Sequence, residues 1–260
     1  VLSNTSRRRA FAIRKFPELG FDDAALTGFV TSGEATWQHI AKRCAGERML
    51  WLSWSEAFQA WDPTYLDGLK VTLAPADSAD FILCQGSHDL RDGLSVRPSG
   101  VFSSGAPNAE LNAALRTCAR RGVPMLCANP DVSVILPDGS HGSMPGVIGE
   151  AYERLGGNVD YFGKPHAPAF DAAIELLGPD VDVSRVLHVG DSLLHDVAGA
   201  NAVGIHSLFV AGGIHHKECG VVSSGGSKMT RDAELKTTVL QRVFRERGIA
   251  PTLSTPAFVW

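Results

Sequence analysis

Residues 185–204 read RVLHVGDSLLHDVAGANAVG, an apolar run followed by a glycine and two separated aspartates. The run Val186–Val189 predicts a short buried strand that ends at Gly190. Asp191 follows the glycine directly, and Asp196 lies near the start of the next predicted helix. Ligands of parallel α/β sheets bind outside the carboxyl ends of the strands, so Asp191 lies where a site is expected.

Two carboxylates at one strand end suit a hard divalent cation such as Mg²⁺, which prefers oxygen ligands. We therefore expect a metal site at Asp191 and Asp196. The same residues also permit an ordinary structural role, in which Asp196 caps the helix and Asp191 makes the turn. The spacing alone leaves both interpretations open.

The rest of the chain alternates short β-rich runs with amphipathic helices, which predicts an α/β fold with a parallel sheet covered on both faces. A helix over 31–44 begins with Thr31 and Glu34 at capping-box spacing. Another over 108–122 has Asn108 as its cap. Further helices are predicted over 5–20 and 233–248, with a loop rich in Gly and Ser over 215–232.

Two other polar clusters follow apolar, strand-like runs. Lys164, in FGKP, is placed to hold an anion, and Pro165 is expected at the first position of the next helix. Ser3 and Asn4, in LSNTS, precede the predicted helix over 5–20, where hydroxyls and N–H groups suit a phosphate. Taken singly, each cluster also fits a solvated lysine or a normal helix cap.

Composition excludes several classes of protein. The 260 residues carry a formal net charge of −4, which argues against a nucleic-acid partner. No apolar stretch is long enough to span a bilayer, so no membrane partner is expected. The five scattered cysteines form no C-x-x-C pair and indicate a reduced compartment, either cytoplasmic or soluble within an organelle. The chain begins with Val1, so a targeting segment is not observable.

Three motifs, in this order, resemble those of the haloacid-dehalogenase-like (HAD) hydrolases: VLSN their second, GKP their third and GDSLLHDVAGANAVG their fourth. CANPD, at 127–131, resembles the subgroup of p-nitrophenyl, nucleotide, phosphoglycolate and pyridoxal phosphatases. The resemblance implies a Rossmann-like parallel-sheet core over 1–34 and 156–260, with an inserted α/β cap over 35–155.

The resemblance also implies roles for individual residues. Ser3 and Lys164 would be catalytic, with Ser3 bonding the transferring phosphoryl group and Lys164 stabilising a phosphoaspartyl intermediate. Asn4 would help position the phosphoryl group of the substrate. Asn129 and Asp131, near the core–cap junction, are assigned to substrate binding or to the hinge. Two further assignments concern the cation: Asp191 would bind Mg²⁺, and Asp196 would support the metal or its waters.

The first motif of that family, a D-x-D that supplies the nucleophile and the acid/base, is absent upstream of LSN. We therefore expect an N-terminally truncated form, inactive by itself, of a Mg²⁺-dependent phosphatase of small phosphorylated metabolites. A non-catalytic relative that binds a phosphorylated ligand or a protein partner is the alternative. A homodimer is compatible with either interpretation.

Other candidates favour structural roles. His215–Cys219 suggests zinc, but no partner pair accompanies it, so a surface loop is preferred. Arg7–Arg9 is interpreted as a solvated helix face. The aromatic residues of the predicted cap are assigned to packing rather than to a substrate pocket. His188 is interpreted as a hydrogen-bonded core residue.

Overall fold

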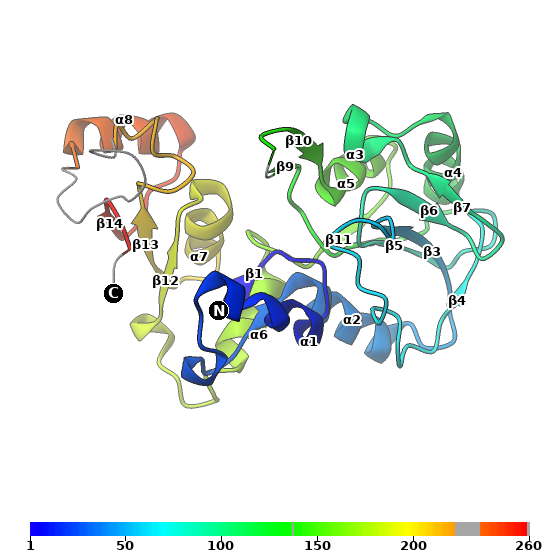
Figure 1. The fold of residues 1–260 in the computed structure, drawn as a ribbon, viewed down its shortest axis with the longest axis horizontal. Coiled ribbons are helices and arrows are strands. Elements are labelled where there is room, and N and C mark those ends of the chain that lie inside the picture. Colours follow the sequence, from blue (N-terminus) through cyan, green and yellow to red (C-terminus); the bar gives the residue numbers. More distant parts are fainter. Residues whose placement is uncertain (137, 222–234, 259–260) are drawn as a thin grey trace. The chain divides into compact units, whose positions relative to one another are not determined.

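The computed structural model describes residues 1–136, 138–221 and 235–258, and the chain divides into two compact units (Figure 1). The first unit is Val1–Gly163 and the second is Lys164–Trp260. Both units combine helices with parallel strands, so the predicted α/β class is confirmed. The division into a core over 1–34 and 156–260 and a cap over 35–155 stays a prediction.

The main sheet of the first unit has seven strands. Its parallel half runs in the order β11, β8, β5 and β3, and β6 and β7 continue it in antiparallel fashion. The short strand β4 also pairs with β3. The strands are β3 (Arg48–Ser53), β4 (Thr72–Leu73), β5 (Phe81–Cys84), β6 (Asp89–Arg91), β7 (Val96–Pro98), β8 (Met125–Cys127) and β11 (Val159–Tyr161).

This sheet is covered on both faces, as the apolar strands predict. Leu50 and Leu52 of β3 pack in one core cluster, which includes Leu111 of helix α4 (Ala109–Arg120) and residues of helix α5 (Pro145–Arg154). Met49 and Trp51, which alternate with them, pack in a second cluster that includes Ile40 of helix α2 (Ser32–Arg43). Successive residues of a strand point to opposite faces, so one apolar strand supplies both cores.

The predicted caps are confirmed at two helices. Thr31 Oγ1 accepts a hydrogen bond of 3.0 Å from the backbone N–H of Glu34 at the start of α2. Asn108 Oδ1 accepts one of 2.9 Å from Leu111 N–H at the start of α4. The remaining short elements of the unit are helix α3 (Val101–Ser104) and the antiparallel strands β9 (Ser133–Ile135) and β10 (His141–Ser143).

The single helix predicted over 5–20 is wrong. Strand β1 (Leu2–Ser3) pairs in parallel with β2 (Val30–Thr31), and helix α1 covers only Arg9–Ala12. Short 3-10 turns follow it, and Gly20 ends the last one with a φ of 77°. Pro17, which lacks an N–H, interrupts the helical hydrogen bonds. Ser3 and Asn4 therefore lie in a strand and the loop after it rather than at a helix N-terminus.

The second unit contains a parallel sheet of three strands, β12 (Leu187–Gly190), β13 (His206–Val210) and β14 (Leu253–Thr255). Its helices are α6 (Ala167–Glu175), a π-helical turn (Leu193–Val197), α7 (Ala198–Ala202) and α8 (Thr237–Arg247). Residues 222–232 of the predicted loop lie outside the described residues. None of the helices in the described ranges is long and apolar enough to cross a membrane.

Pro165 does not begin helix α6, contrary to prediction. The helix starts at Ala167 with His166 as its N-cap, and Pro168 occupies the first turn instead. Pro168 serves there as well as Pro165 would, because the first turn of a helix needs no N–H donor. Lys164 and Pro165 thus belong to the segment before the helix.

Candidate active site

Three side chains of the second unit meet at the end of β12. Lys164 Nζ donates to Asp196 Oδ1 at 2.6 Å, and His188 Nε2 lies 2.9 Å from the same oxygen. The backbone N–H of Ser192 donates to the other carboxylate oxygen at 3.0 Å. The Asp196 side chain is only 6% exposed, so it is held almost entirely by these partners.

The charge of Asp196 is maintained by these neighbours. Burial by itself would raise the pKa of its carboxyl group, because a charged form loses water contacts. The hydrogen bond with His188 and the positive charge of Lys164 outweigh burial and hold the pKa well below its usual range. Asp196 is therefore ionised at neutral pH, and it fixes the ammonium group of Lys164.

Two glycines make room for the aspartates. A Cβ atom on Gly190 would lie 2.2 Å from Asp196 Cγ, so only glycine lets the carboxylate pack against the strand end. A Cβ on Gly213 would lie 2.2 Å from Asp191 Cβ. Asp191 Oδ2 accepts a 3.0 Å hydrogen bond from Ile214 N–H in the same loop. The glycine in GDSLLHD is thus explained by the close approach of the second aspartate.

Asp196 is not the helix cap that the structural alternative required. Ser192 is the N-cap of the π-helical turn, and its Oγ accepts from His195 N–H at 3.0 Å. In turn, Asp196 Oδ2 accepts a hydrogen bond from the backbone N–H of Ser192. One oxygen of Asp196 therefore stabilises the start of the π-helical turn, and the other oxygen binds Lys164.

A divalent cation fits Asp191 better than Asp196. Asp191 is half-buried, and in the described ranges its Oδ1 has no hydrogen-bond partner, so it offers the hard oxygen ligand that Mg²⁺ prefers. Both oxygens of Asp196 already accept hydrogen bonds, one of them from an ammonium group. The described residues contain no cluster of three or more His, Cys, Asp or Glu side chains suited to a metal.

The other predicted residues line one pocket of about 270 Å³ in the first unit. Ser3, Asn4 and Asn129 all lie on its wall, although 125 positions separate Asn4 from Asn129. Asn4 Nδ2 donates to Asp131 Oδ1 at 2.7 Å, and Asp131 N–H donates to Asn129 Oδ1 at 2.9 Å. The structure thus joins SNTS and NPD, but it does not test their assignment to substrate.

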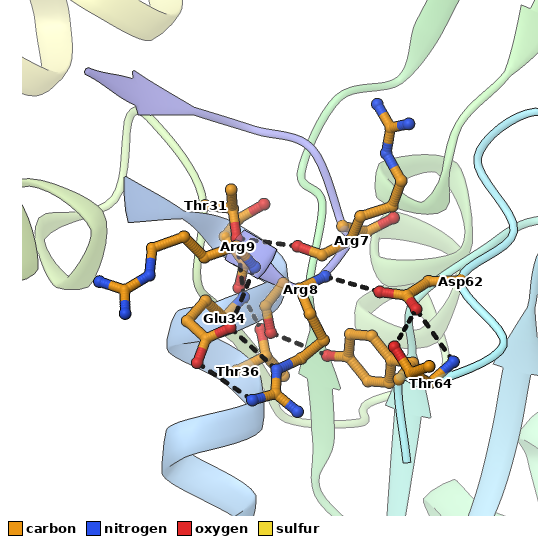
Figure 2. Close-up of polar contacts among 12 residues, drawn as sticks. Arg7, Arg8, Arg9, Thr31, Glu34, Thr36, Asp62 and Thr64 are labelled. Atoms are coloured by element: carbon orange, nitrogen blue, oxygen red, sulfur yellow. Dashed lines mark hydrogen bonds and ion pairs between the residues drawn. The ribbon is translucent and has the colours of Figure 1, made fainter. Parts of the chain in front are cut away.

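The loop that carries Ser3 and Asn4 is fixed by the start of α2. Thr5 O accepts hydrogen bonds from Ser32 Oγ at 3.0 Å and from Gly33 N–H at 3.1 Å. Thr31 Oγ1 donates to Arg7 O at 2.8 Å, a contact drawn in Figure 2. A Cβ on Gly33 would lie 2.2 Å from Ser6 O. The start of α2 therefore holds the backbone of residues 5–7, and these contacts do not use the side chains that line the pocket.

Sequence reasoning missed part of this arrangement. Arg7 and Lys15 line the pocket, whereas Arg7–Arg9 was interpreted as a solvated face. Trp54, assigned to packing, is buried and also lines the pocket. The position of Arg7 directly after SNTS was the only available signal, because the contacts of Lys15 and Trp54 are made through the fold.

A segment of the chain that contains the site at the end of β12 also matches a known protein family. Residues 161–224, which include Lys164, His188 and both aspartates, match the family described as HAD-hydrolase-like. The resemblance to the HAD hydrolases is confirmed. The paired Lys164 and Asp196 thus lie inside the HAD-like segment.

Solved HAD-like structures share the fold. A haloacid dehalogenase-like hydrolase from Brucella suis 1330 is 26% identical with a TM-score of 0.67, covering 98% of this chain and 81% of its own. A p-nitrophenyl phosphatase from Archaeoglobus fulgidus covers the same shares at 21% identity and a TM-score of 0.64. A glycerol phosphate phosphatase from Mycobacterium tuberculosis in complex with calcium is 25% identical, covers 79% and 55%, and has a TM-score of 0.54. No curated protein sequence matches this chain.

Proposed function

We propose that residues 1–260 belong to a phosphatase-type hydrolase that, as the intact protein, acts on small phosphorylated metabolites with Mg²⁺ through an aspartyl-phosphate. The observation that carries the proposal is the poorly exposed pair of Lys164 and Asp196 at the end of β12, with Asp191 directly after that strand, within the HAD-like segment. An ammonium group held rigidly at a strand end stabilises a phosphoryl group as its charge develops. The phosphatase names of similar structures support this reaction class.

Each residue has a definite task in this proposal. Lys164 offsets negative charge on the phosphoryl group, and Asp196, which is itself bonded to His188, holds its ammonium in place. Ser3 donates its hydroxyl to a phosphoryl oxygen. Asn4, which is oriented by Asp131, positions the same group. Asn129 fixes Asp131 and contributes to the substrate wall.

Asp191 is the residue that would hold Mg²⁺. When bound, the cation would neutralise charge on the phosphoryl oxygens and so lower the barrier to displacement. We propose that Asp196 acts on the cation only indirectly, through Lys164 and the waters of the site.

The nucleophile lies outside this site. The only D-x-D spacing in residues 1–260 is Asp180 and Asp182, which are exposed and precede a 3-10 turn. Asp182 Oδ1 accepts from the N–H and Oγ of Ser184, so it caps that turn. Without a carboxylate nucleophile, residues 1–260 should bind phosphate without turning over an ester.

Two measurements on residues 1–260 test the proposal. With Mg²⁺, p-nitrophenyl phosphate should show no turnover, and calorimetry should detect binding of inorganic phosphate that Lys164→Gln weakens. Turnover that Asp191→Ala abolishes would mean that another carboxylate is the nucleophile. Absence of phosphate binding would overturn the proposal and favour the alternative, a HAD-like protein that binds a protein partner.

A further inference from the structure

Two cations, Arg7 and Lys15, line the pocket of Ser3 and Asn4. Burial lowers the pKa of Arg7, and the negative charge of Asp62 offsets only part of that effect. Arg7 and Lys15 are both half-buried, and within residues 1–136, 138–221 and 235–258 neither forms an ion pair. Arg7 makes one side-chain hydrogen bond there, from Nε to Thr5 Oγ1 at 3.1 Å. A guanidinium has five donors, so most of those of Arg7 remain for a ligand.

The next arginine shows what a structural role looks like. Arg8 donates to Glu34 from Nε at 2.8 Å and lies over the Trp37 ring at 3.7 Å. Figure 2 shows Arg8 directed toward Glu34, whereas the Arg7 side chain points away from this pair. The two consecutive arginines thus have different surroundings, and of the two only Arg8 forms an ion pair within the described residues.

The nearest carboxylates are already occupied. Asp62 Oδ2 accepts from Arg8 N–H at 3.0 Å, and its Oδ1 accepts from the N–H and Oγ1 of Thr64. Asp131, on the pocket wall, accepts from Asn4. Neither carboxylate forms a salt bridge with Arg7 or Lys15 in the described residues. The pocket therefore presents two cations and one engaged carboxylate.

We propose that Arg7 and Lys15 bind a second anionic group of the substrate, a carboxylate or a second phosphate, opposite the phosphoryl group. The inference rests on the proposed function, because Ser3 and Asn4 are taken to hold the phosphoryl end. The substrate class is then a small phosphomonoester that carries another anion. The apolar side chains of Trp54, Phe58 and Met144 complete the wall along its carbon skeleton.

A matched pair of probes isolates the second anion. 3-Phosphoglycerate and glycerol 3-phosphate differ only by a carboxylate in place of a hydroxymethyl group. Calorimetry on residues 1–260 should show about tenfold tighter binding of the acid, the gain expected from a charge-assisted hydrogen bond. A third probe, glycerol 1,3-bisphosphate, tells a second phosphate from a carboxylate.

Arg7→Gln and Lys15→Gln should each lower the ratio of the affinity for 3-phosphoglycerate to the affinity for glycerol 3-phosphate toward one. Lys42→Gln is the matched control, because Lys42 is exposed on α2, outside the pocket. Arg7→Gln spares the local fold, since Thr31 binds the carbonyl of residue 7 and not its side chain. Thermal unfolding of each variant checks that point.

The outcomes separate this inference from the proposed function. If both three-carbon probes and inorganic phosphate bind but the acid has no advantage, the second-anion site is wrong and the proposed function stands. A preference that survives in both pocket variants also overturns it. If none of the anions binds, the proposed function itself fails.

Discussion

Lys164 Nζ lies 2.6 Å from Asp196 Oδ1, although 32 positions separate the two residues in the chain. Their side chains are 16% and 6% exposed, so water screens the pair poorly. Removing the carboxylate of Asp196 takes a short, charge-assisted hydrogen bond away from Lys164 and another bond away from His188. The pair is therefore both an element of the candidate site and a source of stability for the second unit.

Asp196→Asn should lower the free energy of unfolding by about 3 kcal/mol, because Lys164 loses its counter-ion. Urea unfolding at neutral pH, followed by circular dichroism, gives this value. Asp171→Asn is the control, since Asp171 is exposed on α6 and should change stability by less than about 0.5 kcal/mol. Equal effects of the two variants would mean that the ion pair does not stabilise the fold.

Acid should remove the stability that the ionised carboxylate of Asp196 contributes to the folded protein. The pKa of Asp196 is lower in the folded protein than in the unfolded chain, where it is about 3.9. Its contribution is then fully present above the unfolded pKa and is lost as the pH falls toward the folded pKa. The stability difference between wild type and Asp196→Asn should be constant from pH 7 to about pH 5 and shrink below about pH 4. A difference that grows on acidification contradicts this assignment.

Gly190→Ala should be more destabilising than an alanine elsewhere in the unit. The added Cβ meets Asp196 Cγ at 2.2 Å, and a packed, charged group cannot easily move aside. Gly204→Ala is the comparison, because Gly204 has a φ of 74° but open space around it. Backbone strain alone costs about 1 kcal/mol there, whereas Gly190→Ala should cost about 2–3 kcal/mol. Chemical denaturation compares the two, and a smaller loss for Gly190→Ala would be evidence against the packed carboxylate.

Ser6→Ala should destabilise the first unit by about 1–3 kcal/mol, because Trp54 Nε1 donates to Ser6 Oγ at 2.8 Å and both residues are buried. Trp54→Phe removes the donor. If the hydrogen bond accounts for the loss, Ser6→Ala should cost about 1 kcal/mol less in the Trp54→Phe background. Additive losses in the four-member cycle would show that the two side chains are not coupled.

Local signals predicted much of the fold. Capping side chains and apolar periodicity identified α2, α4 and β12, since these elements depend on neighbours in the chain. The prediction that β12 is buried is wrong, because Leu187 is exposed and the rest of the strand is only half-buried. The start of the helix after Lys164 was predicted two residues too early, at Pro165 instead of Ala167, because Pro165 and Pro168 carry the same local signal. The long helix over 5–20 failed because a proline lies inside it and because the chain before it pairs with β2.

The contacts of the site were less accessible from sequence. The GDSLLHD spacing indicated a site but not that Asp196 would bind Lys164, since that contact joins two distant segments. Arg8 and Arg7 carry identical local signals, and only the positions of Glu34 and Trp37 separate their roles. Contacts between side chains that lie far apart in the chain produce no periodic pattern in the sequence, so the sequence alone does not predict them.

The central claim is that the ammonium group of Lys164, held by Asp196, binds a phosphoryl group, and a double-mutant cycle on phosphate affinity tests it most directly. Calorimetry with inorganic phosphate and Mg²⁺ should show that Asp196→Asn and Lys164→Gln each weaken binding by about tenfold. The second substitution should cost less in the background of the first, because both act through the same ammonium group. Unchanged phosphate affinity in Lys164→Gln, with the fold intact, would contradict the account.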